Sequence, residues 1–135
     1  MIVVDTNVIA YLLLPTPDTD LAERLLRQDP EWCAPLLWRS ELRNVLALYL
    51  RKGLIDFTGA VRLQEEAESL LWEREYQVPS ADVLEWVAAS PCSAYDCEFV
   101  ALAKGLDVPM VTSDRKVLNA FPDITWSLRA YVEGP

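Results

Sequence analysis

The chain has 135 residues, of which 52% are hydrophobic, and its formal net charge is −9. This length predicts one domain over residues 1–135 with a sizeable core. The acidic charge argues against a nucleic-acid binder that works through a broad basic face. It leaves room for an acidic metal site, because bound cations reverse the local field. The absence of histidine excludes His-based acid–base catalysis, a Ser-His-Asp triad and His-ligated zinc.

The sequence predicts neither a targeting segment nor a membrane partner. The first apolar stretch has no basic residues before it and is interrupted by Asp5, which is not typical of a signal peptide. No uninterrupted apolar run approaches the length of a bilayer span. The three cysteines lack paired metal spacing and are typical of thiols in a reducing compartment. We therefore expect a cytoplasmic protein.

The first fourteen residues combine a strand pattern with a helix pattern. Residues 2–4 are a short β-branched run that suits a strand buried on both faces, and an apolar run over residues 8–14 follows the polar residues 5–7. Asp5 therefore lies at the carboxyl end of a strand, where open α/β sheets bind ligands. The same polar residues also suit the cap of the next helix. Both roles stay open at this point.

Short elements follow up to the middle of the chain. Residues 18–27 predict an amphipathic helix, and residues 32–34 predict a short strand that Pro35 closes. Residues 36–52 predict a longer helix, capped by Gly53 at its end. On a wheel of 100° per residue, one broad arc of this helix is apolar; it contains Leu37, Trp38, Leu42, Val45, Leu46, Leu48 and Tyr49.

Glu41 lies inside that apolar arc. The arginines two positions away cannot serve it within the helix, because such positions do not face each other. A buried carboxylate without a partner costs several kcal/mol or becomes neutral. Glu41 therefore either takes a cation or donor from elsewhere in the fold, or lies where the edge of the arc reaches solvent.

Residues 59–76 predict the next helix, with Thr58 as its cap. We interpret its acid-rich face as a solvated surface; this face holds Glu65, Glu66, Glu68, Glu73 and Glu75. Residues 77–79 predict a third short strand, and residues 80–89 predict another helix.

Ser93 and Asp96 have the spacing of a helix start, with the serine as cap and the acid three residues later. We expect this helix to end at Lys104, before Gly105. Asp96 shares its buried face with the apolar residues three, four and seven positions later, whereas Glu98 points the opposite way. Asp96 also suits the helix dipole at that end, so structural capping is the alternative to a role in a site.

Residues 109–112 predict another buried strand, and Asp114 follows it in the manner of Asp5. Residues 115–120 predict a short helix, and residues 124–126 predict a last strand at a sheet edge. Strands that alternate with helices in this way predict an α/β fold, with a parallel sheet covered on both faces.

This architecture places Asp5 and Asp114 at one edge of the sheet, with Asp96 and Glu41 on helices beside it. Four carboxylates in one dry crevice repel, and some become protonated unless a cation lies among them. Oxygen ligands without His or Cys favour Mg²⁺ or Mn²⁺. These ions suit the hydrolysis of phosphodiesters, because they polarise the phosphate and lower the pKa of the attacking water.

With these residues, the chain resembles a PIN-domain ribonuclease, and more narrowly a VapC-type toxin of a toxin–antitoxin pair. The resemblance covers nearly the whole length. Its strongest parts are MIVVDTNVIAYLL, the SEL segment that holds Glu41, and YDCEFVALAKGLDVPMVTSDRKVL. The last part is the most specific, because an acid that opens a helix is followed by an ALA-like stretch, an apolar strand and T-x-D.

The resemblance implies a three-layer α/β/α sandwich with a central, mainly parallel sheet of four or five short strands. It implies a Mg²⁺- or Mn²⁺-dependent endoribonuclease whose catalytic and metal-binding residues are Asp5, Glu41, Asp96 and Asp114. Thr112 would support that site, and Asn7 would hold the first turn. RNA as substrate, a homodimer and a cognate antitoxin that covers the cleft are also implied, with no nucleotide or organic cofactor.

The acidic net charge requires that any RNA be held locally. Candidates near the acids in sequence are Arg39, Arg43, Arg115 and Lys116. The alternative for each is a surface salt bridge.

Three competing functions remain to be compared. A phosphatase of the haloacid dehalogenase type needs a second acid two residues after the first, where Asn7 stands. A receiver domain needs an acidic pair at the first strand and a lysine after the last, and neither is present. Neither of these explains Glu41. The third is a catalytically silent PIN-fold dimer or partner-binding module, against which four intact acids argue.

Overall fold

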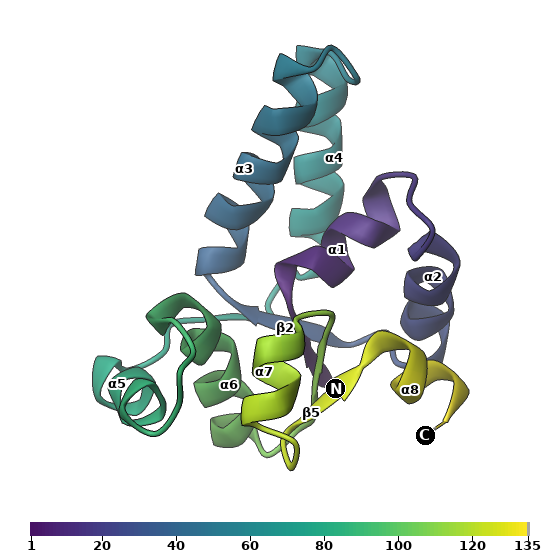
Figure 1. Ribbon diagram of the computed structural model, residues 1–135. Helices are drawn as coiled ribbons and strands as arrows, with labels where there is room; N and C mark the ends of the chain where they lie inside the picture. Colours follow the sequence, from purple (N-terminus) through teal and green to yellow (C-terminus); the bar gives the residue numbers. More distant parts are fainter. Residues whose placement is uncertain (135) are drawn as a thin grey trace.

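A five-stranded, all-parallel sheet forms the centre of the computed structural model, which describes residues 1–134 (Figure 1). Its strands are β1 (Ile2–Val4), β2 (Trp32–Pro35), β3 (Glu75–Tyr76), β4 (Met110–Thr112) and β5 (Thr125–Ser127). Their order is β3-β2-β1-β4-β5, and every neighbouring pair is parallel. The predicted parallel α/β sheet is confirmed. Pro135, the last residue of the predicted domain, lies outside the described residues.

Helices cover both faces of this sheet. They are α1 (Thr6–Leu13), α2 (Thr19–Gln28), α3 (Leu37–Arg51), α4 (Phe57–Leu70), α5 (Ser80–Ala88), α6 (Ala94–Leu106), α7 (Arg115–Ala120) and α8 (Leu128–Glu133). Helices α1–α4 connect strands in one direction along the sheet and α5–α7 connect them in the other. Because such crossovers are right-handed, the two sets lie on opposite faces (Figure 1). None of the helices within residues 1–134 is long and apolar enough to cross a membrane.

The strand order changes direction between β1 and β4. Strand β1 pairs with β2 on one side and with β4 on the other. All three side chains of β1 are fully buried, as the sequence predicts for a strand covered on both faces. In open α/β sheets this point of reversal opens a crevice at the carboxyl ends of the strands. The residues that follow β1 and β4 therefore lie at this crevice.

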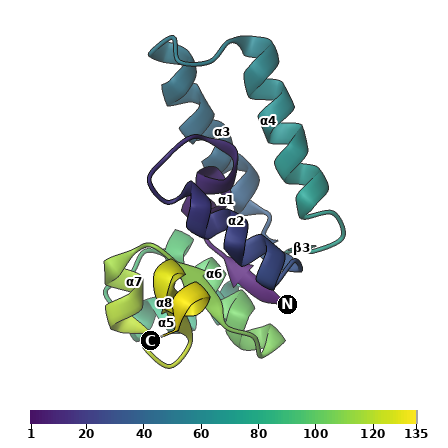
Figure 2. The same ribbon diagram turned by 90° about the vertical axis from the view of Figure 1, so that its right-hand side faces the viewer.

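The second half of α3 leaves the sheet and pairs with α4 in a hairpin that projects from the body (Figures 1 and 2). Trp38 and Leu42, near the sheet, are buried. Leu48, which the wheel places on the apolar arc, is 49% exposed in this projecting part of the helix (Figure 1). The helical period predicts which face is apolar, and it does not predict how far the core extends along the helix.

The region between α3 and α5 differs most from the expectation. Helix α4 begins at Phe57, before Thr58, because the Asp56 carboxylate caps it by accepting a hydrogen bond from the Gly59 N–H at 2.7 Å. It ends at Leu70, well before the predicted residue 76. The chain then turns at Glu73, whose φ is 65°. This turn lets β3 pair with the end of β2, so the third strand lies at residues 75–76 and the prediction of 77–79 is wrong.

Smaller corrections concern the last third of the chain. Helix α6 continues through Gly105 to Leu106, and Asp107 closes it in the left-handed conformation with φ 56°. Strand β5 lies one residue later than predicted. The sequence analysis missed α8, which begins where the Ser127 hydroxyl accepts a hydrogen bond from the Ala130 N–H. Helix α8 packs against α2.

Candidate functional site

A cleft of about 500 Å³ lies at the carboxyl ends of β1 and β4. All four predicted acids line it: Asp5, Glu41, Asp96 and Asp114. Asp5 directly follows β1 and Asp114 lies two residues after β4, whereas Glu41 lies in the second turn of α3 and Asp96 in the first turn of α6. Only Asp5 is buried, and the other three are half-buried, so the cleft is wetter than the dry crevice that we expected. The structure brings together the acids that the sequence pattern selected.

Asp5 is held by hydrogen bonds to both of its carboxylate oxygens. Oδ1 accepts from the Val8 N–H at 2.9 Å, which caps α1. Oδ2 accepts from the Thr112 hydroxyl at 2.5 Å and from the Ser113 N–H at 3.0 Å. Burial is the main cause that raises the pKa of Asp5; the hydrogen bonds partly offset it, and the charge of Asp114 adds to the increase. Asp5 thus caps its helix and lines the cleft at the same time.

Glu41 receives its donor from α1. The Thr6 hydroxyl donates to Glu41 Oε1 at 2.7 Å. Burial is the main cause that raises the pKa of Glu41, and the nearby charges of Asp5, Asp96 and Glu98 raise it further. Of the two possibilities for Glu41, a donor from elsewhere in the fold is therefore the one observed. The sequence analysis missed both Thr6 and the influence of Glu98, because the wheel of one helix contains no information about its neighbours.

Asp96 and Asp114 use their helix starts differently. The Ser93 hydroxyl accepts from the Asp96 N–H at 3.1 Å, so serine is the cap, as predicted. Within residues 1–134 no group donates a hydrogen bond to the Asp96 carboxylate. Asp114 caps α7 through Oδ1, which accepts from the N–H groups of Lys116 at 2.8 Å and Val117 at 3.2 Å.

Thr112 and Asn7 connect the parts of this site. The Thr112 hydroxyl donates to Asp5 and accepts from the Asp114 N–H at 3.0 Å, so one side chain links the two strand-end acids. Asn7 lines the cleft, and its Nδ2 donates to the Ser113 hydroxyl at 3.5 Å, across to the turn that follows β4. Thr112 therefore lies beside the acids, and the side chain of Asn7 bonds to the turn after β4 and not to the first turn, which it was expected to hold.

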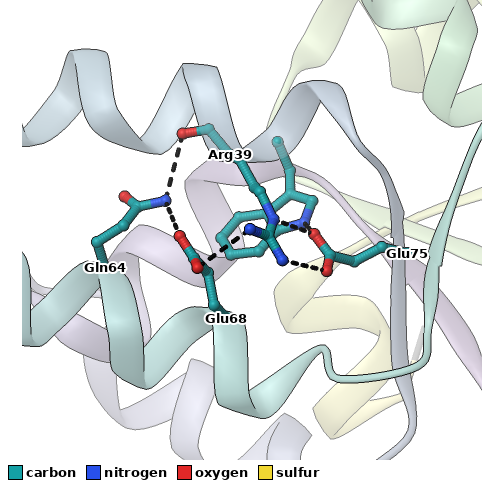
Figure 3. A network of polar contacts seen from close by, with 5 residues as sticks. Arg39, Gln64, Glu68 and Glu75 are labelled. Carbon is teal, nitrogen blue, oxygen red and sulfur yellow. Dashed lines mark hydrogen bonds and ion pairs between the residues drawn. The ribbon is translucent and has the colours of Figure 1, made fainter.

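The predicted basic residues lie outside the cleft. Arg39 forms ion pairs with Glu75 at 2.6 Å and Glu68 at 3.1 Å (Figure 3). The alternative of a salt bridge is thus the one seen for Arg39, and the interpretation of these two glutamates as a solvated face is wrong. Arg43 lines a different hollow between α3 and α4, and Arg115 lines a second cleft. Lys116 is exposed on α7.

The cleft also contains polar and aromatic residues that the sequence analysis did not select. Ser40 and Asn44 line it from α3, although they lie outside the apolar arc of the wheel. Tyr95 lines it from the first turn of α6 and is 63% exposed. Its position directly before Asp96 was the only signal in the sequence. These groups provide hydrogen bonds and a ring face beside the acids.

The donor set fits a hard divalent cation. Among the described residues, no lysine or arginine lines the cleft, so nothing in it neutralises the four acids. No group of three or more Asp, Glu or Cys side chains within residues 1–134 already converges as a ready set of metal ligands. Carboxylates that lack a cation repel, which keeps such side chains apart. Oxygen donors from four separate elements around one cleft match the preference of Mg²⁺ and Mn²⁺.

Comparison with known proteins agrees with this geometry. The family model of the PIN domain matches residues 2–123. Ribonuclease VapC3 from Pyrobaculum aerophilum is 30% identical over 128 residues, which are 90% of this chain and 95% of that protein.

Solved structures share the fold. The crystal structure of PAE2754 from Pyrobaculum aerophilum matches with a TM-score of 0.77 at 18% identity. The match covers 98% of this chain and 93% of the PAE2754 chain. VapC20 from Mycobacterium tuberculosis, a toxin that cleaves the sarcin–ricin loop, matches with a TM-score of 0.66 at 20% identity. The match covers 89% of this chain and 95% of the VapC20 chain. The family match over most of the chain, the similar relative and the doubly covered parallel sheet lead to one conclusion: the chain belongs to the PIN-domain family.

Proposed function

We propose that the chain is a divalent-metal-dependent endoribonuclease that acts as the toxin of a toxin–antitoxin pair. The observation that carries the proposal is the cleft that four carboxylates line, with no basic residue among the described lining residues. The similar relative from Pyrobaculum aerophilum is named a ribonuclease, which supports RNA as the substrate. The cytoplasm is the compartment in which such an enzyme meets RNA.

The proposed metal-binding residues are Asp5, Glu41, Asp96 and Asp114. A bound Mg²⁺ or Mn²⁺ supplies Lewis-acid chemistry, which polarises a phosphate oxygen and makes water a better nucleophile. The chain orients these ligands through its own hydrogen bonds: Thr112 and the Ser113 N–H fix Asp5, and Thr6 fixes Glu41. Ligands held in this way bind metal with less reorganisation. The hydroxyls of Thr6 and Thr112 are therefore positioning groups for the reaction.

The rim of the cleft suits a single strand. The exposed ring of Tyr95 lies beside Asp96 and offers a surface on which a base can stack. Ser40 and Asn44 of α3 add hydrogen-bonding groups to the lining of the cleft. Stacking accepts any base, so these residues hold the strand while the acids act on its backbone.

The proposed antitoxin and homodimer contacts need apolar surface, which the α3–α4 hairpin provides. Large apolar residues are exposed on or beside it, among them Leu48, Leu50, Leu54, Phe57 and Val61. A hollow of about 430 Å³ lies between the two helices. Exposed apolar patches of this kind are typical of protein interfaces.

The deciding experiment is cleavage of total RNA by the purified protein with Mg²⁺ or Mn²⁺, with EDTA, and with the Asp96→Asn variant. We expect discrete fragments that disappear in EDTA and fall by at least about 100-fold in the variant. Asp123→Asn is the matched control, because Asp123 is exposed outside the cleft. If folded, metal-loaded protein freed of antitoxin cuts no RNA, the silent partner-binding module replaces this proposal.

A further inference from the structure

A second cleft, also of about 500 Å³, lies on the other side of the turn between β4 and α7. Its polar lining includes Arg115 and Asn119 of α7, Ser127 at the end of β5, and Arg129 of α8. These residues follow the carboxyl ends of β4 and β5, which are neighbours in the sheet. The second cleft therefore continues the sheet edge at which the acidic cleft opens.

The two clefts are directly connected. Thr112 lines both of them. Ser113 lines the second cleft, its N–H bonds to Asp5, and its hydroxyl accepts from Asn7 of the acidic cleft. Thr112 and Ser113 form the boundary between the clefts. An RNA strand that leaves the acidic cleft over this turn would therefore enter the second cleft directly.

The clefts differ in charge. Arginine side chains line the second cleft and, among the described residues, no basic side chain lines the first. Arg115 has no ion-pair partner within residues 1–134. Arg129 pairs with Glu133 at 3.0 Å in an exposed i,i+4 contact, which is weak in water and easily exchanged for a phosphate. Asp18 also lines the second cleft, so the cleft contains one acidic side chain beside its two arginines.

We propose that the second cleft binds a backbone phosphate of the RNA next to the one that is cut, through Arg115 and Arg129. This inference rests on the proposed ribonuclease function and adds residues that position its substrate. Guanidinium groups suit the task, because their donors match two phosphate oxygens at once. It also explains how a chain of net charge −9 holds a polyanion: the cations lie beside the metal site and not in it.

The test compares wild type with the double variant Arg115→Ala/Arg129→Ala. In Mn²⁺ we expect KM for a short single-stranded RNA to rise by about 10-fold while kcat changes less than about threefold, the signature of lost binding at a site away from the chemistry. In EDTA, fluorescence anisotropy of the same RNA, measured over a range of salt concentrations, should show weaker binding. The slope of log K against log salt concentration should become shallower by about 0.7, the contribution of one phosphate contact on a single strand.

The matched control is Arg62→Ala/Lys104→Ala, which removes the same charge from exposed sites on α4 and at the end of α6. A double variant that equals this control in KM and in salt dependence overturns the inference, while cleavage by wild type keeps the proposed function. If wild type cuts no RNA, the proposed function fails. The anisotropy measurement then still shows whether the second cleft binds RNA. Inorganic phosphate is titrated in parallel; phosphate binding that the double variant loses, with RNA binding unchanged, identifies a free-anion site and also overturns the inference.

Discussion

Helix α3 separates two groups of acidic side chains that differ in how their charge is neutralised. On one side, Arg39 donates to Glu75 through two nitrogens and to Glu68 through a third (Figure 3). On the other side, Glu41 faces the acids of the cleft. The hydrogen bonds from Arg39 lower the pKa of Glu75, whereas burial and the neighbouring carboxylates raise the pKa of Glu41.

The contrast distinguishes acids that stabilise the chain from acids that wait for a ligand. The Arg39 network satisfies its charges within the protein and joins α3, α4 and β3. The acidic cleft leaves like charges together, and this arrangement costs stability in the absence of a cation. Retaining such a cost is typical of functional sites. Four experiments test this distinction.

The largest effect concerns metal-dependent stability. At 100 times its dissociation constant, Mn²⁺ should raise the free energy of unfolding of wild type by about 2.7 kcal/mol. Asp96→Asn should lose most of this gain, and Arg39→Met should keep it. Because no described group donates to the Asp96 carboxylate, the change leaves the fold intact. Urea unfolding followed by circular dichroism, with and without Mn²⁺, measures the gain for each variant. A gain in Asp96→Asn equal to that of wild type would show that Asp96 does not bind the metal.

Breaking the Arg39 network should have the next largest effect. Arg39→Met keeps an apolar stem but leaves the partly buried Glu75 with the Trp38 indole N–H as its one donor among residues 1–134. We expect the free energy of unfolding to fall by about 1–3 kcal/mol, the cost of an unpaired polar group. Arg62→Met, at an exposed site, should stay within about 0.5 kcal/mol. A loss below that limit for Arg39→Met would show that the network is only a surface contact.

Glu41→Gln should not lower the free energy of unfolding as Arg39→Met does. The amide oxygen can still accept from the Thr6 hydroxyl, while a half-buried charge is removed from among other acids. In EDTA we expect the free energy of unfolding to be unchanged or higher by less than about 1 kcal/mol. RNA cleavage should nevertheless be lost. A marked loss of stability would mean that the charge of Glu41 supports the fold.

The smallest effect is a pH dependence of the Arg39 network. The folded-state pKa of Glu75 is lowered, first of all by the hydrogen bonds from Arg39. Its contribution to stability is therefore present above the unfolded-state pKa of about 4.3 and disappears as the pH falls through the lower folded value. The stability difference between wild type and Glu75→Gln should be widest near neutral pH and narrow below about pH 4. Urea midpoints at a series of pH values measure it, and a difference that is constant with pH would contradict the assignment.

The sequence predicts the acids of the cleft well because each of them belongs to a local pattern. Asp5 directly follows one buried strand, Asp114 lies two residues after another, and Asp96 follows its serine cap at fixed spacing. Glu41 was visible as a charge on an apolar arc. Parallel strands then bring distant acids to one edge, so the α/β alternation is enough to group them.

The rest depends on contacts between distant segments, which periodicity does not encode. Arg39 and Glu75 are 36 residues apart, and their pairing requires the turn at Glu73 that shortens α4. Thr6 meets Glu41 across 35 residues, from a different helix. The second cleft requires α8, whose start is a serine cap without an acid three residues later. These features become visible only when the packing of the helices is known.

The hydrogen bonds that hold Asp5 have a consequence for synthesis on the ribosome. Asp5 is made first, but its partners Thr112 and Ser113 follow 107 and 108 residues later. At about 5–20 residues per second, translation of the intervening chain takes roughly 5–20 s. During that interval β1 lacks its neighbour β4 and the cleft lacks one wall. A nascent chain therefore carries its first acid long before it can use it, and the site is completed only after β4 has left the exit tunnel.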